Sequence, residues 1–448
     1  MTSATSFVPV ANEVSYEVIV VGAGASGSPL ASRLSEDPNR QVLLLEAGPD
    51  YSAIADTPLD LRNGHHNSVV DHDWELEYSP TEKRPGQPLP RGRVTGGSSA
   101  VNTCIFLRGV PEDYAEWASR GNPEWAWNNV LKTFCRLERD LDFGSEPHHG
   151  DAGPISVRRY PHDELTELHQ AFLATADELD FPECLDQNDP LAWGAGPLPM
   201  NKLGQLRIST ASAYLAPARL RPNLEIRGGC HTNRLLITRG RVTGVEVVRT
   251  DGSLEQIRAN LIVLCAGAIH TPGILLRSGI GPVEDLTRIG VDVIADVSGV
   301  GRNLSDHPGI IVLCRPTHLE LVAGNQPIIQ TILRYTAPAS DQRMDLQIEQ
   351  LTFAGRENLP YFGVAAVLEQ VDGVGELIFP NADPFAAPQI RSRFCENEGD
   401  ATRLADGFFD ALRFVDAGPL GALTEEVLFP DMQRISHRDD VVSLLRRF

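Results

Sequence analysis

The chain has 448 residues, of which 42% are hydrophobic and 22% charged, and a formal net charge of −21 at pH 7. This length predicts two or three domains with a large apolar interior, and the acidic balance argues against a nucleic-acid-binding surface. No apolar run is long enough for a transmembrane segment, and residues 1–15 lack the pattern of a secretory signal. Seven cysteines without C-x-x-C spacing favour reduced thiols, so we expect a cytoplasmic protein without a metal site.

The first motif follows a short apolar run near the N-terminus. Residues 18–21 read as a buried parallel strand, and Gly22, Gly24 and Gly27 then form G-x-G-x-x-G where a helix should start. The glycines allow a tight turn and a close backbone approach to a pyrophosphate, while the helix N-terminus offers free N–H groups. The sequence therefore predicts a dinucleotide site.

A second apolar strand is expected from Gln41 to Leu45, and it ends at Glu46. A carboxylate at this position can accept hydrogen bonds from the hydroxyls of an adenosine ribose. It would also repel a 2′-phosphate, which argues against NADP. NAD and FAD both remain compatible with these residues.

A second glycine-rich loop lies in "RGRVTGGSSAVNTCIFLRG", residues 91–109. Gly96 and Gly97 let the backbone approach a pyrophosphate or a flat ring closely, and Arg93 adds positive charge. Cys104 lies in the apolar run that follows. We interpret it as a packing residue, because the sequence shows no neighbour that would stabilise a thiolate.

Short alternating strands fill residues 223–260 and lead into the continuous apolar run "LIVLCAG", which ends at Gly267. Such a meander, returning to a parallel strand that we expect to be buried, comes long after the first βαβ unit, so it interrupts the nucleotide domain and favours a flavin-binding fold. Residues 310–429 combine candidate strands, "MDLQIEQLTF" and "GELIF", with the helical pattern "EGDATRLADGFFDALRFV". They predict a separate layer that faces the substrate.

Residues 91–109 and "GAIHTPGILLRSGIGP", residues 267–282, resemble the two signature motifs of the glucose-methanol-choline oxidoreductases, which oxidise alcohols with FAD. The resemblance covers nearly all of the first 310 residues. It implies an α/β fold, α+β overall, with a Rossmann-like FAD-binding domain that contains the meander and a substrate domain built on an antiparallel sheet with helices. We expect residues 12–155 and 205–310 to form the first domain, and residues 156–204 and 311–448 to form the second.

The resemblance also implies which residues bind FAD. The opening motif would hold the ADP half, and Asn102 to Ile105 would lie along the isoalloxazine. Val101 stands where some relatives carry a histidine that is linked covalently to the flavin, so noncovalent FAD is expected. The expected cofactor-binding residues are Gly22, Gly24, Ala25, Ser26, Gly27, Glu46, Arg93, Val94, Gly97, Asn102, Thr103, Cys104, Ile105, Thr232 and Gly267.

Flavin-dependent alcohol oxidation needs a base near the substrate hydroxyl, and in the family this is a histidine in a C-terminal segment. That segment is absent here, so we assign no catalytic residue and expect the polypeptide to continue beyond Phe448. We interpret His270 as a helix-start residue, His307 as part of a turn and His437 as a surface residue.

The expected activity is hydride transfer from the carbon of a small-molecule alcohol to flavin N5. The electron acceptor is left open between oxygen, a quinone and another molecule. Two alternatives remain: a non-catalytic FAD-binding homologue that lacks the catalytic histidine, and a lyase on the same scaffold.

Overall fold

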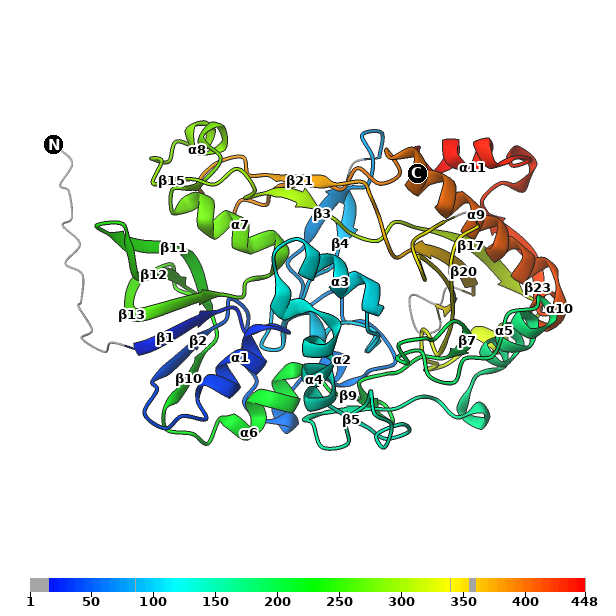
Figure 1. The fold of residues 1–448 in the computed structure, drawn as a ribbon, viewed down its shortest axis with the longest axis horizontal. Helices are drawn as coiled ribbons and strands as arrows, with labels where there is room; N and C mark the ends of the chain where they lie inside the picture. Colours follow the sequence, from blue (N-terminus) through cyan, green and yellow to red (C-terminus); the bar gives the residue numbers. More distant parts are fainter. Residues whose placement is uncertain (1–15, 85, 339, 354–359, 448) are drawn as a thin grey trace.

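The computed structural model describes residues 16–84, 86–338, 340–353 and 360–447. Figure 1 shows a sheet of the nucleotide-binding type at one end of the molecule and a second large sheet at the other, with helices α3 (Pro111–Ser119) and α4 (Trp127–Leu137) between them. The predictions for residues 1–15, which include the start of the expected first domain, and for Phe448 lie outside the described residues.

The first sheet has the strand order β10-β2-β1-β13-β12-β11. Its core is parallel, because β1 pairs in parallel with both β2 and β13, and β2 pairs in parallel with β10. Helix α1 (Gly27–Leu34) packs Ala31 against Val18 and Val20 of β1. The Rossmann-like prediction is therefore confirmed. The strands are β1 (Tyr16–Val21), β2 (Val42–Leu45), β10 (Leu224–Arg227), β11 (Cys230–Thr238), β12 (Arg241–Arg249) and β13 (Leu254–Leu264).

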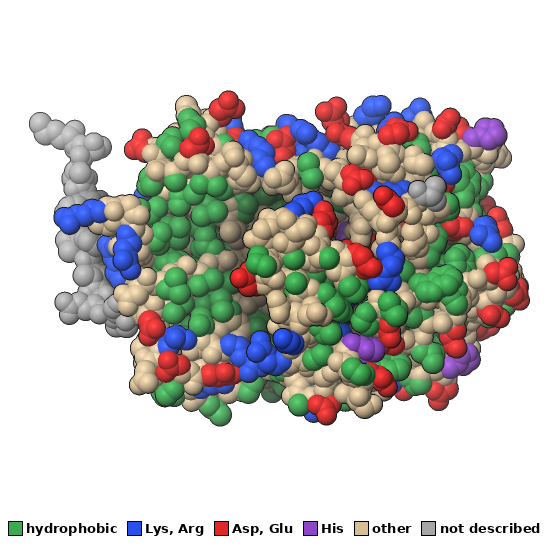
Figure 2. Space-filling model, in the orientation of Figure 1, with side chains coloured by type: hydrophobic (Ala, Val, Ile, Leu, Met, Phe, Trp, Pro, Cys, Tyr) green, Lys and Arg blue, Asp and Glu red, His purple; other side chains and the backbone are tan. Residues whose placement is uncertain are grey.

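The predicted meander is present, since β11, β12 and β13 form consecutive antiparallel pairs before β13 joins β1. The expectation that the last strand is fully buried is wrong. Leu261 is 53% exposed, and residues 262–264 are only half-buried, because no described element covers this part of the sheet. Figure 2 shows hydrophobic side chains gathered on the side where these strands lie.

The second large sheet has the strand order β23-β17-β20-β19-β18-β7, and every pairing in it is antiparallel. One face packs against α9 (Glu398–Asp416), where Leu346 and Ile348 join the buried cluster around Phe408. The predicted strand "MDLQIEQLTF" and the long helix are confirmed in this layer, whereas the predicted strand "GELIF" is part of a smaller sheet. The strands are β7 (Gly194–Pro197), β17 (Gly309–Pro316), β18 (Thr331–Tyr335), β19 (Leu346–Thr352), β20 (Phe362–Leu368) and β23 (Thr424–Phe429).

A smaller sheet, β16-β21-β22-β3-β4, joins segments far apart in the sequence. Strand β3 (Leu76–Ser79) precedes the second glycine loop, yet it pairs in parallel with β22 (Gln389–Arg391). This sheet therefore links the two expected domains. Its other strands are β4 (Gln87–Leu89), β16 (Arg302–Leu304) and β21 (Gly375–Ile378).

The remaining helices and short strands connect these sheets. Helix α7 (Gly267–Arg277) follows β13 and packs beside β11. The others are α2 (Leu59–Arg62), α5 (Glu167–Glu178), α6 (Ala216–Ala218), α8 (Val283–Ile289), α10 (Gly418–Ala422), α11 (Arg438–Leu445), β5 (Glu138–Asp140), β6 (Ile155–Val157), β8 (Lys202–Leu203), β9 (Leu206–Arg207), β14 (Ile280–Gly281) and β15 (Ala295–Asp296).

Candidate functional site

The two glycine-rich loops meet at the carboxyl ends of β1 and β2. A Cβ on Gly97 would lie 2.6 Å from the Cα of Gly24, so the two backbones touch. Gly22 has a φ of +98°, and a Cβ there would lie 2.5 Å from the carbonyl oxygen of Cys265. The turn can therefore form only with glycine at these positions, which leaves a backbone-lined cradle beside the start of α1.

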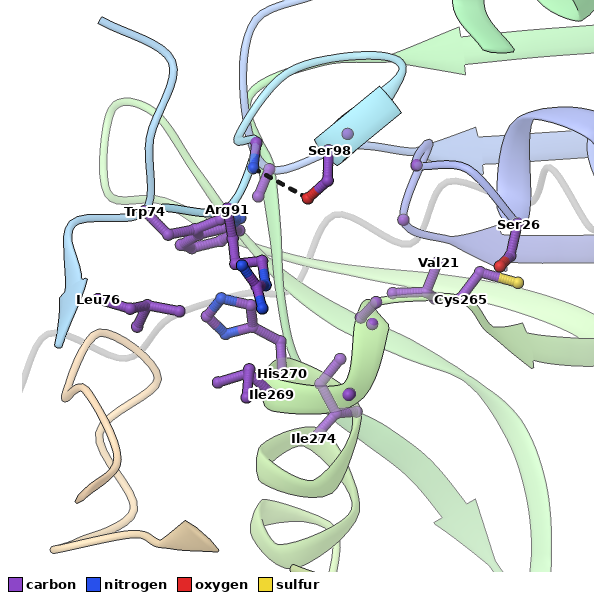
Figure 3. A pocket seen from close by; sticks show the side chains of 18 of the residues that line it. Val21, Ser26, Trp74, Leu76, Arg91, Ser98, Cys265, Ile269, His270 and Ile274 are labelled. Carbon is purple, nitrogen blue, oxygen red and sulfur yellow. Dashed lines mark hydrogen bonds between the residues drawn. The ribbon is translucent and has the colours of Figure 1, made fainter. Parts of the chain in front are cut away.

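A cavity of about 440 Å³ extends from this cradle along the start of α7. Figure 3 shows Val21, Ser26 and Cys265 on one side of it and Trp74, Arg91 and His270 on the other. The elements that line it include both glycine loops, the end of β2, the start of β11 and the start of α7. The predicted residues that it brings together are Gly22, Gly24, Ala25, Ser26, Glu46, Gly97, Thr232 and Gly267.

Glu46 lies in the wall of this cavity and binds both flanking turns. Its carboxylate accepts hydrogen bonds from the backbone N–H of Ala23, at 3.0 Å, and of Gly48, at 2.9 Å. Burial nevertheless raises the pKa of Glu46 to about 7, since desolvation of the charge outweighs these bonds. The side chain therefore positions the glycine turn while it faces the cavity.

An aromatic wall closes the end of the cavity away from the glycine turn. The rings of Trp74 and His270 lie 3.9 Å apart between centroids, and His231 lies 5.8 Å from Trp74. Burial lowers the pKa of both His231 and His270 to about 4, so both imidazoles are neutral at pH 7. Within the described residues, His231 Nδ1, Thr232 Oγ1 and His270 Nε2 are buried without a hydrogen-bond partner.

The unpartnered atoms indicate whether a dinucleotide fits the cavity. Buried polar atoms normally have partners, so a set of them around an aromatic surface suits the polar edge of a bound nucleotide. The glycine cradle suits the pyrophosphate in the same way. Sequence reasoning missed Trp74 and His231, and it interpreted His270 only as a helix-start residue. Isolated residues such as these follow no period along the sequence, so no pattern predicts that they meet.

Several predicted cofactor residues do not line the cavity. Gly27 packs against the glycine turn, where a Cβ would lie 1.9 Å from the Gly22 carbonyl oxygen. Val94 is buried with Ala100 and Val101 beneath the second glycine loop. Arg93 is exposed, and its guanidinium lies 5.0 Å from the centroid of the Trp74 ring.

The segment from Asn102 to Ile105 leads away from the cavity towards the second large sheet. Asn102 is exposed and Thr103 half-buried, while Ile105 pairs with Met200 in an isolated bridge. Cys104 is fully buried, and burial raises the pKa of its thiol. A neutral, enclosed thiol agrees with the predicted packing role.

The other histidines discussed above lie at the surface. His307 has 51% of its side chain exposed, and its Nδ1 lies 3.7 Å from Glu369. Its backbone N–H, rather than its ring, donates to Asp306, so the two side chains form no dyad. His437 is exposed directly before α11, which confirms its interpretation as a surface residue.

His149 lies among three carboxylates that the sequence does not place beside it. Nδ1 lies 2.8 Å from Glu138 and 3.1 Å from Asp140, and Nε2 lies 2.8 Å from Asp186. No spacing in the sequence relates these carboxylates to the adjacent pair His148 and His149, and the fold brings them together from separate segments. Arg159 pairs with both aspartates.

The charged groups of this cluster pair with one another. The carboxylates raise the pKa of His149 to about 10, so the imidazole is protonated at pH 7 and donates from both nitrogens to its carboxylate neighbours. Arg108, whose guanidinium lies 2.6 Å from Glu138, is the third cation beside the three carboxylates, so the cluster is a set of buried ion pairs.

Parallel strands, two touching glycine loops and a cavity between them define a dinucleotide-binding protein of the flavoenzyme type. A family model described as GMC oxidoreductase matches residues 16–309. The chain belongs to this family of FAD-dependent oxidoreductases, which act on alcohols.

Individual relatives agree with this assignment. The chain is 35% identical over 399 residues to an uncharacterized GMC-type oxidoreductase of Rhodococcus erythropolis, covering 87% of this chain and 78% of that protein. It is 33% identical over 413 residues to 5-(hydroxymethyl)furfural oxidase of Methylovorus sp., covering 88% and 76%. The structure of pyridoxine 4-oxidase from Mesorbium loti matches with a TM-score of 0.87 at 25% identity, covering 96% of this chain and 86% of that one.

Family membership confirms FAD as the cofactor and an alcohol as the class of substrate. The cradle, the neutral imidazoles and the unpartnered buried atoms fit that cofactor. Among the described residues, no helix has both the length and the apolar character that a bilayer span requires.

Proposed function

We propose that the cavity between the glycine loops holds FAD noncovalently, with the adenosine ribose on Glu46 and the pyrophosphate between Gly24 and Gly97. The observation that carries this proposal is the direct contact between the two glycine backbones at the start of α1. Only a ligand that approaches the backbone closely gains from such a turn, and a pyrophosphate at a helix N-terminus does so. Bound FAD would supply the hydride acceptor for alcohol oxidation.

We also propose that the two parts of the chain divide this task. Residues 12–155 and 205–310 would hold the cofactor, and residues 156–204 and 311–448 would bind the alcohol. Strand β7 supports the assignment of residues 156–204, because it pairs with β18 of the second large sheet. The electron acceptor, whether oxygen, a quinone or another molecule, is left open. A cytoplasmic location is part of the proposal, and it is supported by seven free cysteines.

The first experiment tests the cofactor and the reaction together. Acid precipitation of the purified protein is expected to leave yellow FAD in the supernatant, because Val101 offers no nucleophile for a covalent link. Addition of benzyl alcohol or 5-(hydroxymethyl)furfural without oxygen is expected to bleach the flavin. Flavin retained in the pellet would refute noncovalent binding. A flavin that no alcohol bleaches would favour a non-catalytic or lyase homologue.

A second experiment tests Glu46. Hydrogen bonds from ribose hydroxyls to a carboxylate contribute about 1.5–3 kcal/mol each, so Glu46→Gln is expected to weaken FAD binding roughly tenfold to hundredfold. Because FAD selects the ionised carboxylate, whose pKa is about 7, affinity for the wild-type protein should fall as pH drops below 7. The glutamine variant should lack this pH dependence.

Isothermal titration of the apoprotein with FAD at several pH values measures both effects. Gly252→Ala, in an open turn far from the loops, serves as the control for mutagenesis itself. Equal dissociation constants for wild type and Glu46→Gln would show that the carboxylate only braces the turn.

A further inference from the structure

The face of the second large sheet that turns away from α9 has an unusual composition. Along β19, Leu346 and Ile348 point into the cluster around α9, so Gln347, Glu349 and Leu351 lie on the opposite face. Glu349 is directly opposite Ile332 in the register between β18 and β19. A glutamate thus sits in the middle of a sheet, beside an apolar residue that is fully buried.

This face lies against the segment that follows the second glycine loop. Ile332 belongs to a buried cluster with Cys104 and Met200, and Leu351 packs against the same cluster, as does Ile105. Glu349 is the direct cross-strand neighbour of Ile332 and lies two residues from Leu351 on the same face. Glu349 therefore lies beside the cluster that contains Cys104, and the family resemblance implies that the Asn102–Ile105 segment of this cluster lies along the isoalloxazine.

Glu349 is enclosed by protein but still reachable from outside. One carboxyl oxygen accepts a hydrogen bond from the amide of Gln347. The other has no hydrogen-bond partner among the described residues, and it is not one of the fully buried unpartnered atoms. In β19, only Glu349 and Leu351 keep partial exposure. One carboxyl oxygen of Glu349 thus has no partner among the described residues, at a partly exposed position of β19 beside the cluster around Ile332.

The charged side chains near Glu349 do not compensate its charge. Arg334 lies opposite Gln347 on the same face, and its positive charge interacts mainly with the carboxylates of Glu369 and Asp113. His307, at the start of β17, also lies beside Glu369. Burial, with the nearby Glu369 carboxylate, raises the pKa of Glu349 to about 7, which indicates that no cation is paired with it.

We propose that Glu349 forms part of the alcohol-binding wall and selects substrates that offer it a hydrogen-bond donor and carry no negative charge. This inference rests on the proposed function, since it places the alcohol between the Asn102–Ile105 segment and the second large sheet. A neutral or cationic polar group satisfies the free oxygen of Glu349. A carboxylate in the same position meets the like charge of the partly buried Glu349, which strongly disfavours binding.

Two unreactive ligands of the same shape test this selection. Para-toluamide is neutral and offers N–H donors, whereas para-toluate is anionic, and neither contains an alcohol. Each is titrated into the FAD-loaded protein, and binding is followed by perturbation of the flavin absorption. At pH 8.5, about one and a half units above the pKa of Glu349, we expect the wild-type protein to bind the amide at least about tenfold more tightly than the acid.

Glu349→Gln is expected to lower the ratio of amide affinity to acid affinity to less than about threefold, because glutamine removes the charge and keeps the shape of the side chain. Glu349→Asp, which keeps the charge, should retain most of the ratio. Glu398→Gln removes a surface charge whose side chain is 74% exposed, and it should leave the ratio unchanged. In the wild-type protein the ratio should also fall at pH 5.5, where Glu349 is protonated, and the glutamine variant should show no such change.

An equal ratio in wild type and Glu349→Gln, or no binding of para-toluamide to the wild-type protein, would overturn the inference. Flavin bleaching by benzyl alcohol separates this result from the proposed function. Bleaching with an unchanged ratio refutes only the role of Glu349. If Glu349→Gln changes the ratio of amide to acid affinity but no alcohol bleaches the flavin, alcohol oxidation is refuted and the binding role of Glu349 stands.

Discussion

Replacing Asp186 with alanine is expected to lower the free energy of unfolding by about 3–5 kcal/mol, because the substitution removes one of the carboxylates that compensate the buried charges of Arg159 and His149. Asp186 accepts hydrogen bonds from Arg159, at 2.6 Å, and from His149, at 2.8 Å. Both side chains are almost fully buried. Urea-induced unfolding of wild type and variant measures the difference.

Asp189→Ala provides the matched control. Its carboxylate is 42% exposed and lies 3.6 Å from His148, outside the buried core of the cluster. Exposed pairs of this kind contribute about 0–1 kcal/mol, so the control should be close to wild type. Equal destabilisation by the two substitutions would contradict the assigned role of the buried cluster.

The same cluster predicts how stability depends on pH. The pKa of Asp186 is lowered to about 2, so its contribution is complete above the ordinary aspartate value of about 4 and is lost as pH falls through 2. The pKa of His149 is raised to about 10, so its contribution is complete below about 6.5 and is lost as pH rises through 10. The difference between wild type and Asp186→Ala should therefore be largest between about pH 4 and 6.5.

Local patterns were sufficient to predict the elements that form the cofactor cradle. The apolar run before Gly22 is β1, and the glycine spacing correctly placed the start of α1 at Gly27. The helical period of residues 398–415 likewise predicted α9. In each case the signal lies within a few turns or one strand, so no knowledge of distant contacts is needed.

The parts that the sequence did not reveal depend on contacts between distant segments. Trp74, His231 and His270 meet from three elements, and no spacing in the chain relates them. The exposure of β13 was missed for a similar reason, since an apolar run predicts burial only if another element covers it. Side-chain chemistry could be predicted at single positions, but the set of side chains that share a cavity follows from topology.

The close approach of the two glycine loops predicts the largest effect on cofactor binding. Gly97 has a φ of +52°, and a Cβ there would lie 2.6 Å from the Cα of Gly24. An alanine at this position must strain its own backbone and also push the two loops apart. Each effect costs about 1–3 kcal/mol, so Gly97→Ala is expected to weaken FAD binding roughly hundredfold or more.

Gly204→Ala separates these two costs. Gly204 has a nearly equal φ of +56°, but no atom lies within 4 Å of the position that its Cβ would occupy. It therefore carries the backbone strain without the contact between loops, and its FAD affinity should match that of the wild-type protein. Titration of each apoprotein with FAD measures the affinities, and thermal unfolding of the same samples shows whether both variants are folded. If folded Gly97→Ala and Gly204→Ala proteins bind FAD equally well, the meeting of the two glycine loops is not the cofactor cradle.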